Sequence, residues 1–366
     1  MALAAAKASG SNNANTNNLN MSTSMHGTNG SGSGHNSSAL NGSSSQGNQG
    51  SQSNQGNQPN TGSQGAHNAH SNQGSQGHQG TPRKSTNNDS DLRTDEEVYM
   101  WVTDLVYSNN SDDSLSMLGK KREQFKDLGV VLWNSYGVMP IILQEIVKVY
   151  PLLSPPQLPV NNSNRVSNAL QLLQCIASHH ETQIPFLNSH MLLYLYPFLN
   201  TTSSSRPYEY LRLTSLGVIG ALVKNDSPQV VTFLLSTEII PLCLRIIETT
   251  SGISKTLALY IVLRILQDDQ GLIYVCQTYE RFFAVNQVLT IVVNQLVQQP
   301  QDSSLRLLKH VVMCYRRLAD DERAKHSLRE ILPEALRNGT FTPLLREEQG
   351  TKKILNQLIL SINQEM

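Results

Sequence analysis

Two pairs of adjacent carboxylates, Asp268-Asp269 and Asp320-Asp321, are the residues whose spacing first suggests chemistry. Paired carboxylates can act as general acids and bases. Each pair, however, falls at an expected turn between helices, where Asp is a preferred helix cap. The sequence also lacks a Gly-x-Ser-x-Gly elbow, a P-loop and a His-Glu-x-x-His motif. These patterns predict a protein that is not an enzyme.

The cysteines and histidines predict neither a metal site nor a cofactor. The four cysteines are widely spaced in apolar runs, and no Cys-x-x-Cys pair occurs: Cys175, Cys243, Cys276 and Cys314. Such thiols behave as small buried hydrophobes in a reducing compartment. The five histidines between residues 26 and 78 have no regular metal-ligand spacing. We therefore expect the chain to bind no metal and no cofactor.

Basic residues recur along the expected long helices, notably Arg165, Arg206, Arg212, Arg264 and Lys309. A ladder of cations along a groove could meet an acidic peptide or nucleic-acid phosphates. Solvated helix faces with local ion pairs would give the same pattern. The chain has 28 basic and 28 acidic residues, a net charge of zero, so we expect any nucleic-acid role to be secondary and sensitive to salt.

Residues 206–224, RPYEYLRLTSLGVIGALVK, form the stretch around which the chain is organised. A proline in the first helical turn is followed by apolar residues on most of the circumference, which is typical of a buried helix. Tyr210, Thr214 and Gly217 fall at helical spacing on one face. That face is either a close packing surface or a recognition surface with a tyrosine beside a glycine floor.

The elements that must position these residues are repeated helices. Long apolar helices are expected at residues 165–177, 210–223, 254–266 and 305–318, separated by shorter helices and polar turns. Armadillo and HEAT repeats of ~40–47 residues have this rhythm. The sequence therefore predicts an all-α, armadillo-repeat-type superhelical solenoid, in which the long helices line a concave groove.

The N-terminal part has a different composition. Residues 1–92 are rich in Asn, Gly, Ser and Gln, and predict a disordered low-complexity arm. The armadillo-repeat domain is expected at 93–366, opening with a capping box from Thr94 to Glu97. Four prolines within 151–164 predict a linker. We identify neither a signal peptide nor an apolar run of the ~20 residues needed to span a membrane.

Several motifs carry a family resemblance. RPYEYLRLTSLGVIGALVK, together with STEIIPLCLRIIE, CQTYERF and RLLKHVV, resembles the "required for cell differentiation" family from Thr94 onward. That family is the armadillo-repeat subunit of the CCR-NOT deadenylase complex. The resemblance implies a scaffold that docks on the large scaffold subunit of that complex. It would receive peptide motifs from RNA-bound regulators, and so promote deadenylation, translational repression and mRNA decay.

The same resemblance implies two binding surfaces. Tyr210, Gly217 and Val147 match a groove for short amphipathic helices of RNA-binding regulators. Tyr279 and Arg281 match a pocket for tryptophan side chains of silencing proteins, with Arg323 expected near them. A ring and a guanidinium beside a slot suit an indole through stacking and cation–π contact.

Other functions remain open at this point. Direct nucleic-acid binding in a basic concave groove is one, and a role as a transcriptional co-regulator, also linked to the family, is another. A nuclear-import adaptor is disfavoured because Trp101 and Trp133 both precede the regular repeats. The sequence leaves open whether the solenoid forms a homodimer. The family's roles imply a location in cytoplasm and nucleus.

Overall fold

The computed structural model describes residues 88–108, 111–298 and 304–364, all within one compact unit, Gly80–Met366. The predicted low-complexity arm lies outside the described residues, except that residues 88–92 are helical. All regular elements of the described part are helices. The prediction of an all-α fold is therefore confirmed.

Four helices precede the regular repeats: α1 (Asn88–Tyr107), α2 (Ser111–Lys121), α3 (Leu128–Asn134) and α4 (Val138–Lys148). Helix α1 begins before the predicted cap at Thr94, because residues 88–93 contain no proline or glycine that would end a helix. Gly137, between α3 and α4, has a φ of 86°, which only glycine adopts without strain. The chain thus turns at Gly137 between the two helices.

The proline-rich linker is shorter than predicted. A 3₁₀ turn, η1 (Tyr150–Leu152), follows α4, and α5 (Val160–Ser178) begins directly after Pro159. Proline is tolerated at the start of a helix because the first N–H groups have no partner within the helix. Residues 160–164 therefore join the helix that the sequence predicted from residue 165.

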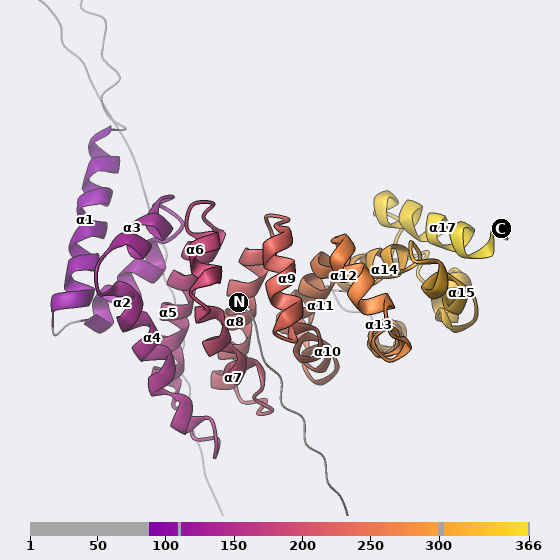
Figure 1. Cartoon of the computed structure of the whole chain (residues 1–366), viewed down its shortest axis with the longest axis horizontal. Helices are drawn as coiled ribbons and strands as arrows, with labels where there is room; N and C mark the ends of the chain where they lie inside the picture. Colours follow the sequence, from indigo (N-terminus) through magenta and orange to yellow (C-terminus); the bar gives the residue numbers. More distant parts are fainter. Residues whose placement is uncertain (1–87, 109–110, 299–303, 365–366) are drawn as a thin grey trace, which may run out of the picture. The chain divides into compact units, whose positions relative to one another are not determined.

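The remaining chain repeats a pattern of two or three helices, most of them short, followed by one helix of 15 to 18 residues (Figure 1). Its elements are α6 (Gln183–Asn188), η2 (Met191–Leu195), α7 (Tyr196–Leu199), α8 (Arg206–Val223), α9 (Pro228–Ser236), α10 (Ile239–Thr249), α11 (Gly252–Gln267), α12 (Asp269–Cys276), α13 (Tyr279–Gln298), α14 (Ser304–Leu318), α15 (Glu322–Ile331), α16 (Glu334–Arg337) and α17 (Gln349–Asn363).

The long helices pack on one another in chain order. Contacts link α5 to α8, α8 to α11, α11 to α14, and α14 to α17. We call these five helices the helix ladder. Fully buried aliphatic residues run through it, including Leu173, Leu222 and Leu259. Since no unit buries its apolar face alone, the units share one continuous core.

Candidate functional site

Tyr210 and Gly217 lie on the part of α8 that meets α5. The Nε2 of Gln171 on α5 donates a hydrogen bond to the Tyr210 hydroxyl oxygen, at 3.3 Å. A Cβ atom at position 217 would lie 3.2 Å from Oε1 of Gln174, also on α5. Both positions are partly exposed. The predicted common face therefore has one polar border, formed by the two glutamines.

A cavity of about 770 Å³ lies at the amino ends of α5, α8 and α11. Its walls include Arg206, Glu209 and Tyr210 of α8, the segment 250–254 at the start of α11, and Val160 of α5. The residues before these three helices make no side-chain cap. Charged, aromatic and aliphatic groups thus surround open backbone N–H groups, an arrangement that can hold a peptide segment with mixed side chains.

Val147 does not share this cavity. It lies on α4, with 38% of its surface exposed. Helix α4 packs on α5 and η2, and Val147 is absent from the described residues that line the cavity. The structure therefore places Tyr210 at the cavity, Gly217 further along the same helix, and Val147 on a separate element.

The second predicted surface forms where α12 meets α13. Tyr279 is 64% exposed and stacks on Phe283, with ring centroids 5.7 Å apart. The guanidinium carbon of Arg281 lies 3.9 Å from the centroid of the Tyr274 ring. Arg323 reaches from α15 and donates to the Cys276 carbonyl at 3.4 Å. The three predicted residues thus converge on residues 274–283.

Sequence analysis missed Tyr274 and Phe283, which complete this surface. Phe283 is 42% exposed and follows Tyr279 by one helical turn, a spacing that could have identified it. Tyr274 lies on the preceding helix, so its contact with Arg281 depends on the angle of the α12–α13 turn. The Arg281 guanidinium is already stacked on the Tyr274 ring. The rings of Tyr279 and Phe283 are the ones exposed to solvent.

Two of the cations predicted as possible ligand contacts, Arg165 and Arg212, have partners inside the fold. Arg212 is only 3% exposed and donates to Thr201 O and Ser203 O, at 3.0 and 2.8 Å. Arg165 forms ion pairs with Glu145 and Asp112, one of its bonds to Glu145 being 2.9 Å long. Both guanidinium groups are thus partnered within the fold, and that of Arg212 is also buried.

Arg264 also serves the fold. Its guanidinium donates to the Val223 and Lys224 carbonyls at the end of α8, both at 3.2 Å, and pairs with Asp226. Lys309 is exposed and pairs with Glu348 at 3.2 Å. Arg206 is exposed at the cavity and makes no side-chain bond to the described residues. Of the five predicted cations, Arg206 is thus the one best placed for a ligand.

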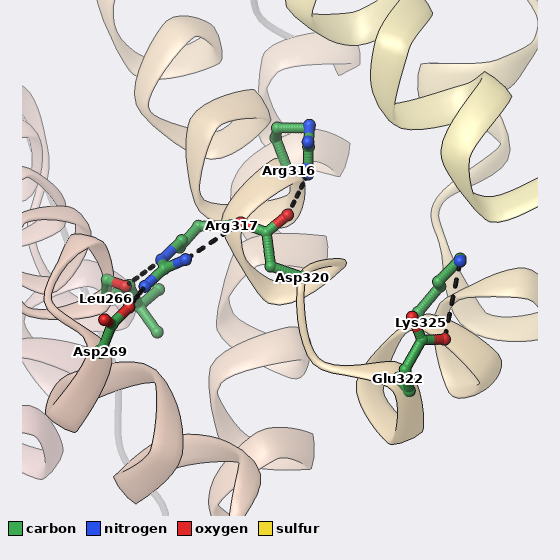
Figure 2. Close-up of polar contacts among 7 residues, drawn as sticks. All are labelled: Leu266, Asp269, Arg316, Arg317, Asp320, Glu322 and Lys325. Carbon is green, nitrogen blue, oxygen red and sulfur yellow. Dashed lines mark hydrogen bonds and ion pairs between the residues drawn. The ribbon is translucent and has the colours of Figure 1, made fainter.

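Several arginines bind carbonyl ends of other helices, and we call three of them, Arg264, Arg317 and Arg329, the arginine caps. Arg317 of α14 donates to Leu266 O of α11 at 2.9 Å and pairs with Asp269 and Asp320 (Figure 2). Arg329 of α15 donates to Ile362 O and Gln364 O, both at 2.7 Å. Because the last carbonyls of a helix have no intrahelical partner, the caps satisfy them.

The paired carboxylates are structural, as predicted. The Asp268 side chain caps α12 by accepting from Gln270 N at 2.8 Å. Asp321 caps α15 by accepting from Arg323 N and Ala324 N. Their neighbours Asp269 and Asp320 pair with Arg317 (Figure 2). All four carboxylates thus either cap the start of a helix or pair with Arg317, which joins two helices.

The four thiols are free. Cys243, Cys276 and Cys314 are buried, while Cys175 is partly exposed. Burial raises the pKa of Cys243 and of Cys276 to about 12, and that of Cys175 to about 11. A thiolate is the nucleophilic and metal-binding form, so these side chains are poorly suited to either chemistry. No group of three or more potential metal ligands occurs in the described ranges.

Within residues 88–364, apart from the two gaps, no single helix has the length and apolarity to cross a bilayer. Two sharply bent helix pairs meet the length and composition criteria: Leu128–Asn134 with Val138–Leu152, and Pro228–Ser236 with Ile239–Thr249.

The helix ladder and its surfaces define the class of protein: an armadillo-type helical-repeat protein. A designed armadillo repeat protein, YIII(Dq)4CqI, superposes with a TM-score of 0.53 at 13% identity, covering 73% of this chain and all of the designed one. At that identity the likeness concerns the fold. The armadillo-type architecture predicted from the repeats is confirmed.

The particular family follows from closer relatives. The model of the cell differentiation family, Rcd1-like, matches residues 101–362. Cell differentiation protein rcd1 of Schizosaccharomyces pombe is 60% identical over 73% of this chain and 93% of its own length. Protein CAF40 of Saccharomyces cerevisiae is 55% identical over 74% of this chain and 72% of its own. The chain belongs to the Rcd1-like cell differentiation family, which confirms the resemblance.

Proposed function

We propose that this chain is a non-catalytic adaptor subunit of a CCR-NOT deadenylase complex. In this proposal it docks on the large scaffold subunit and binds peptide motifs of RNA-associated regulators. The main support is the high identity to rcd1 and CAF40 across the whole helix ladder. An adaptor role also agrees with the carboxylates and thiols described above, which serve helix ends and the core.

The cavity at the amino ends of α5, α8 and α11 is the proposed site for a short helical motif. This cavity is the single observation that carries the peptide-binding part of the proposal. Tyr210 forms part of its wall, and Gly217 leaves room further along α8. Helix-in-groove binding uses apolar anchors at the i, i+3, i+4 and i+7 positions of the ligand, and Leu213, Val160 and Ile253 offer apolar wall at this cavity.

The α12–α13 surface is the proposed site for a tryptophan side chain. The exposed Tyr279 and Phe283 rings provide a stacking surface, and Arg281 is held close by through Tyr274. A cation–π contact between a guanidinium and an indole contributes ~0.5–2 kcal/mol. A single tryptophan would bind weakly, so we expect partners to carry several tryptophans or a second motif.

Recruitment would act through effective concentration. A regulator bound to both a messenger RNA and this adaptor brings the deadenylase to the same poly(A) tail, without any chemistry by the adaptor itself. Such a role requires the protein to be present where messenger RNA is repressed and where it is transcribed. We therefore propose that it occurs in cytoplasm and nucleus.

The test is affinity purification from cell extract with wild-type chain and a Gly217→Trp variant, read by mass spectrometry. An added Cβ at 217 would meet the flexible end of Gln174, and the position is partly exposed, so we expect the variant to fold. We expect the wild type to recover the large scaffold and deadenylase subunits, and Gly217→Trp to keep them while losing regulators. Thr232→Trp, at an exposed position on α9, is the matched control and should lose neither group.

Tyr279→Ala tests the second surface in the same assay, with Tyr107→Ala as control because Tyr107 is 76% exposed on α1. Only the Tyr279 variant should lose tryptophan-containing partners. Recovery of no deadenylase component by the wild type would overturn the proposal as a whole. Equal recovery of regulators by Gly217→Trp and wild type would overturn the proposed peptide site alone.

A further inference from the structure

A second cavity, of about 390 Å³, lies beside the first at the amino ends of α11 and α14. Thr250, Ser251 and Gly252 line both cavities. Its other walls include Glu248, Lys255 and Gln295. Its volume falls in the range of small-ligand pockets, ~300–1,000 Å³. Neither the sequence motifs nor the proposed peptide and tryptophan sites account for it.

Lys255 is the unusual group in this cavity. It lies on α11 with only 7% of its surface exposed, although lysine is almost never fully buried without a partner. Its Nζ donates to Oε1 of Gln295 at 2.6 Å. No carboxylate of the described residues lies within ion-pair distance of Lys255. Among the described residues, a cation with three donors is thus held by one neutral oxygen.

The start of α11 adds to the positive character of the cavity. The Ser251 side chain makes no cap to this helix, which begins at Gly252. The first N–H groups of a helix carry partial positive charge and bind anions readily. A buried ammonium and an uncapped helix start therefore border the same space, and two independent features favour a negative ligand.

We propose that this cavity binds a single carboxylate, as supplied by an acidic side chain of a partner peptide. One ammonium balances one negative charge, whereas phosphate sites are commonly built from clustered arginines. The exposed Glu248 carboxylate in the lining opposes an extended polyanion such as nucleic acid. Assigning the carboxylate to a peptide rests on the proposed adaptor function, but anion binding at Lys255 does not.

Continuity with the first cavity explains how a peptide would reach the site. Because residues 250–252 form a shared border, a helix seated against Tyr210 can extend an Asp or Glu side chain across that border. The carboxylate would then supply the charge that Gln295 lacks. Burial lowers the pKa of Lys255 below its usual value, and a bound carboxylate should raise it again.

The experiment follows the ¹³Cε resonance of Lys255 in the full chain, assigned by its loss in Lys255→Met. We expect the pKa of Lys255 to rise saturably as sodium acetate is added, and to stay constant in sodium chloride of equal ionic strength. Acetate should also shift the backbone amides of residues 252–254. That shift should weaken by at least about tenfold in apparent affinity in Lys255→Met, a change of ~1.4 kcal/mol.

Lys352→Met, an exposed lysine on α17, is the control and should bind acetate like wild type. The proposed site would be overturned if the pKa of Lys255 rose without saturation in acetate, or rose equally in chloride. Unchanged acetate binding by Lys255→Met would overturn it too. Tighter binding of inorganic phosphate than of acetate would overturn the assignment to a carboxylate. None of these results depends on recovery of deadenylase subunits, so failure here is distinct from failure of the adaptor proposal.

Discussion

The two ends of the helix ladder use similar polar groups for different purposes. At the carboxyl ends, Arg264 and Arg317 bind the last carbonyls of α8 and α11, and their charge is consumed by the fold. At the amino ends, Arg206 and Lys255 border cavities, beside helix starts that no side chain caps. The cations at one end thus join the repeats, and those at the other border the two cavities.

This difference shows why the number of basic residues is a poor guide to ligand binding in a helical-repeat protein. An arginine near the end of a long helix reaches the preceding repeat and stabilises its exposed carbonyls. A cation near the start of a long helix repels the partial positive charge there, so its presence favours an anionic partner. Position along the helix, rather than residue type, separates the two roles.

The largest effect that would test the comparison is that of Gly271→Ala, in the first turn of α12 where it packs on the carboxyl end of α11. A Cβ there would lie 1.8 Å from the Ile265 carbonyl oxygen, so α12 could not cross the end of α11 as it does. We expect a loss of about 3 kcal/mol or more in unfolding free energy, measured by urea denaturation. Gly350→Ala, where the nearest atom is 3.8 Å away, should cost nothing.

Arg317→Ala should have the next largest effect. Removing the guanidinium leaves the Leu266 carbonyl and the Asp269 carboxylate without this partner, while Asp320 keeps its ion pair with Arg316 (Figure 2). We expect a loss on the order of 2 kcal/mol, because orphaned acceptors at a partly buried site keep their desolvation cost. Thermal and urea denaturation would measure it. Arg306→Ala, an exposed position on the same helix, should change stability little, and an equal loss there would contradict the capping role.

Acidic pH should lower the stability of the fold through His310, which lies on α14. His310 has a buried Nδ1 without a partner among the described residues, its ring lies 5.9 Å from that of Tyr260, and Arg306 and Lys309 are close. Burial, and then these two cations, lower the pKa of His310 to about 4. Above its usual pKa of 6.5 the ring is neutral in both states, so the histidine has no pH effect there.

As the pH falls from 6.5 towards 4, the unfolded chain binds a proton at residue 310 that the native chain does not. Stability should therefore fall, by up to about 2 kcal/mol near pH 5. His310→Phe should remove this part of the acid sensitivity in denaturation series across that range. His326→Phe, an exposed position on α15, should retain it, and identical curves for wild type and His310→Phe would refute the assignment.

The smallest expected effect is that of Arg206→Ala at the first cavity. The side chain is exposed and makes no bond to the described residues, so unfolding free energy should change by less than about 0.5 kcal/mol. Partner recovery should change instead, if the amino ends are the ligand side. A large loss of stability in Arg206→Ala without a change in partner binding would contradict a ligand role for the amino ends.

Much of the fold could be predicted because it depends on local periodicity. The four long helices were placed within a few residues of α5, α8, α11 and α14. The misplaced starts, at Asn88 and Val160, lie where polar residues continue a helix beyond its apolar pattern. Tyr279, Arg281 and Arg323 also converge on one surface, as the family motifs implied.

The roles of the arginines could not be predicted. Arg264 and Arg317 bind carbonyls 41 and 51 residues away in the chain, and no local pattern reveals contacts between repeats. Lys255 gave a weak signal, since it occupies the helical register of the buried Leu259 and Val262. Its significance depends on a cavity that appears only when α11 and α14 are assembled.

The arginine caps also influence how the repeats come apart. Guanidinium bonds join α11 to the end of α8 and α14 to the end of α11. Neutral amides join the α8 region to the preceding helices, from Asn225 to Ser178 O of α5 at 3.4 Å and from Gln183 of α6 to Leu222 O at 2.9 Å. Hydrogen bonds with a charged donor are stronger than neutral ones. The interaction between adjacent repeats therefore differs in strength along the helix ladder. Opening should therefore be cooperative across α8, α11 and α14, and amide hydrogens there should exchange together, later than those at the α5 boundary.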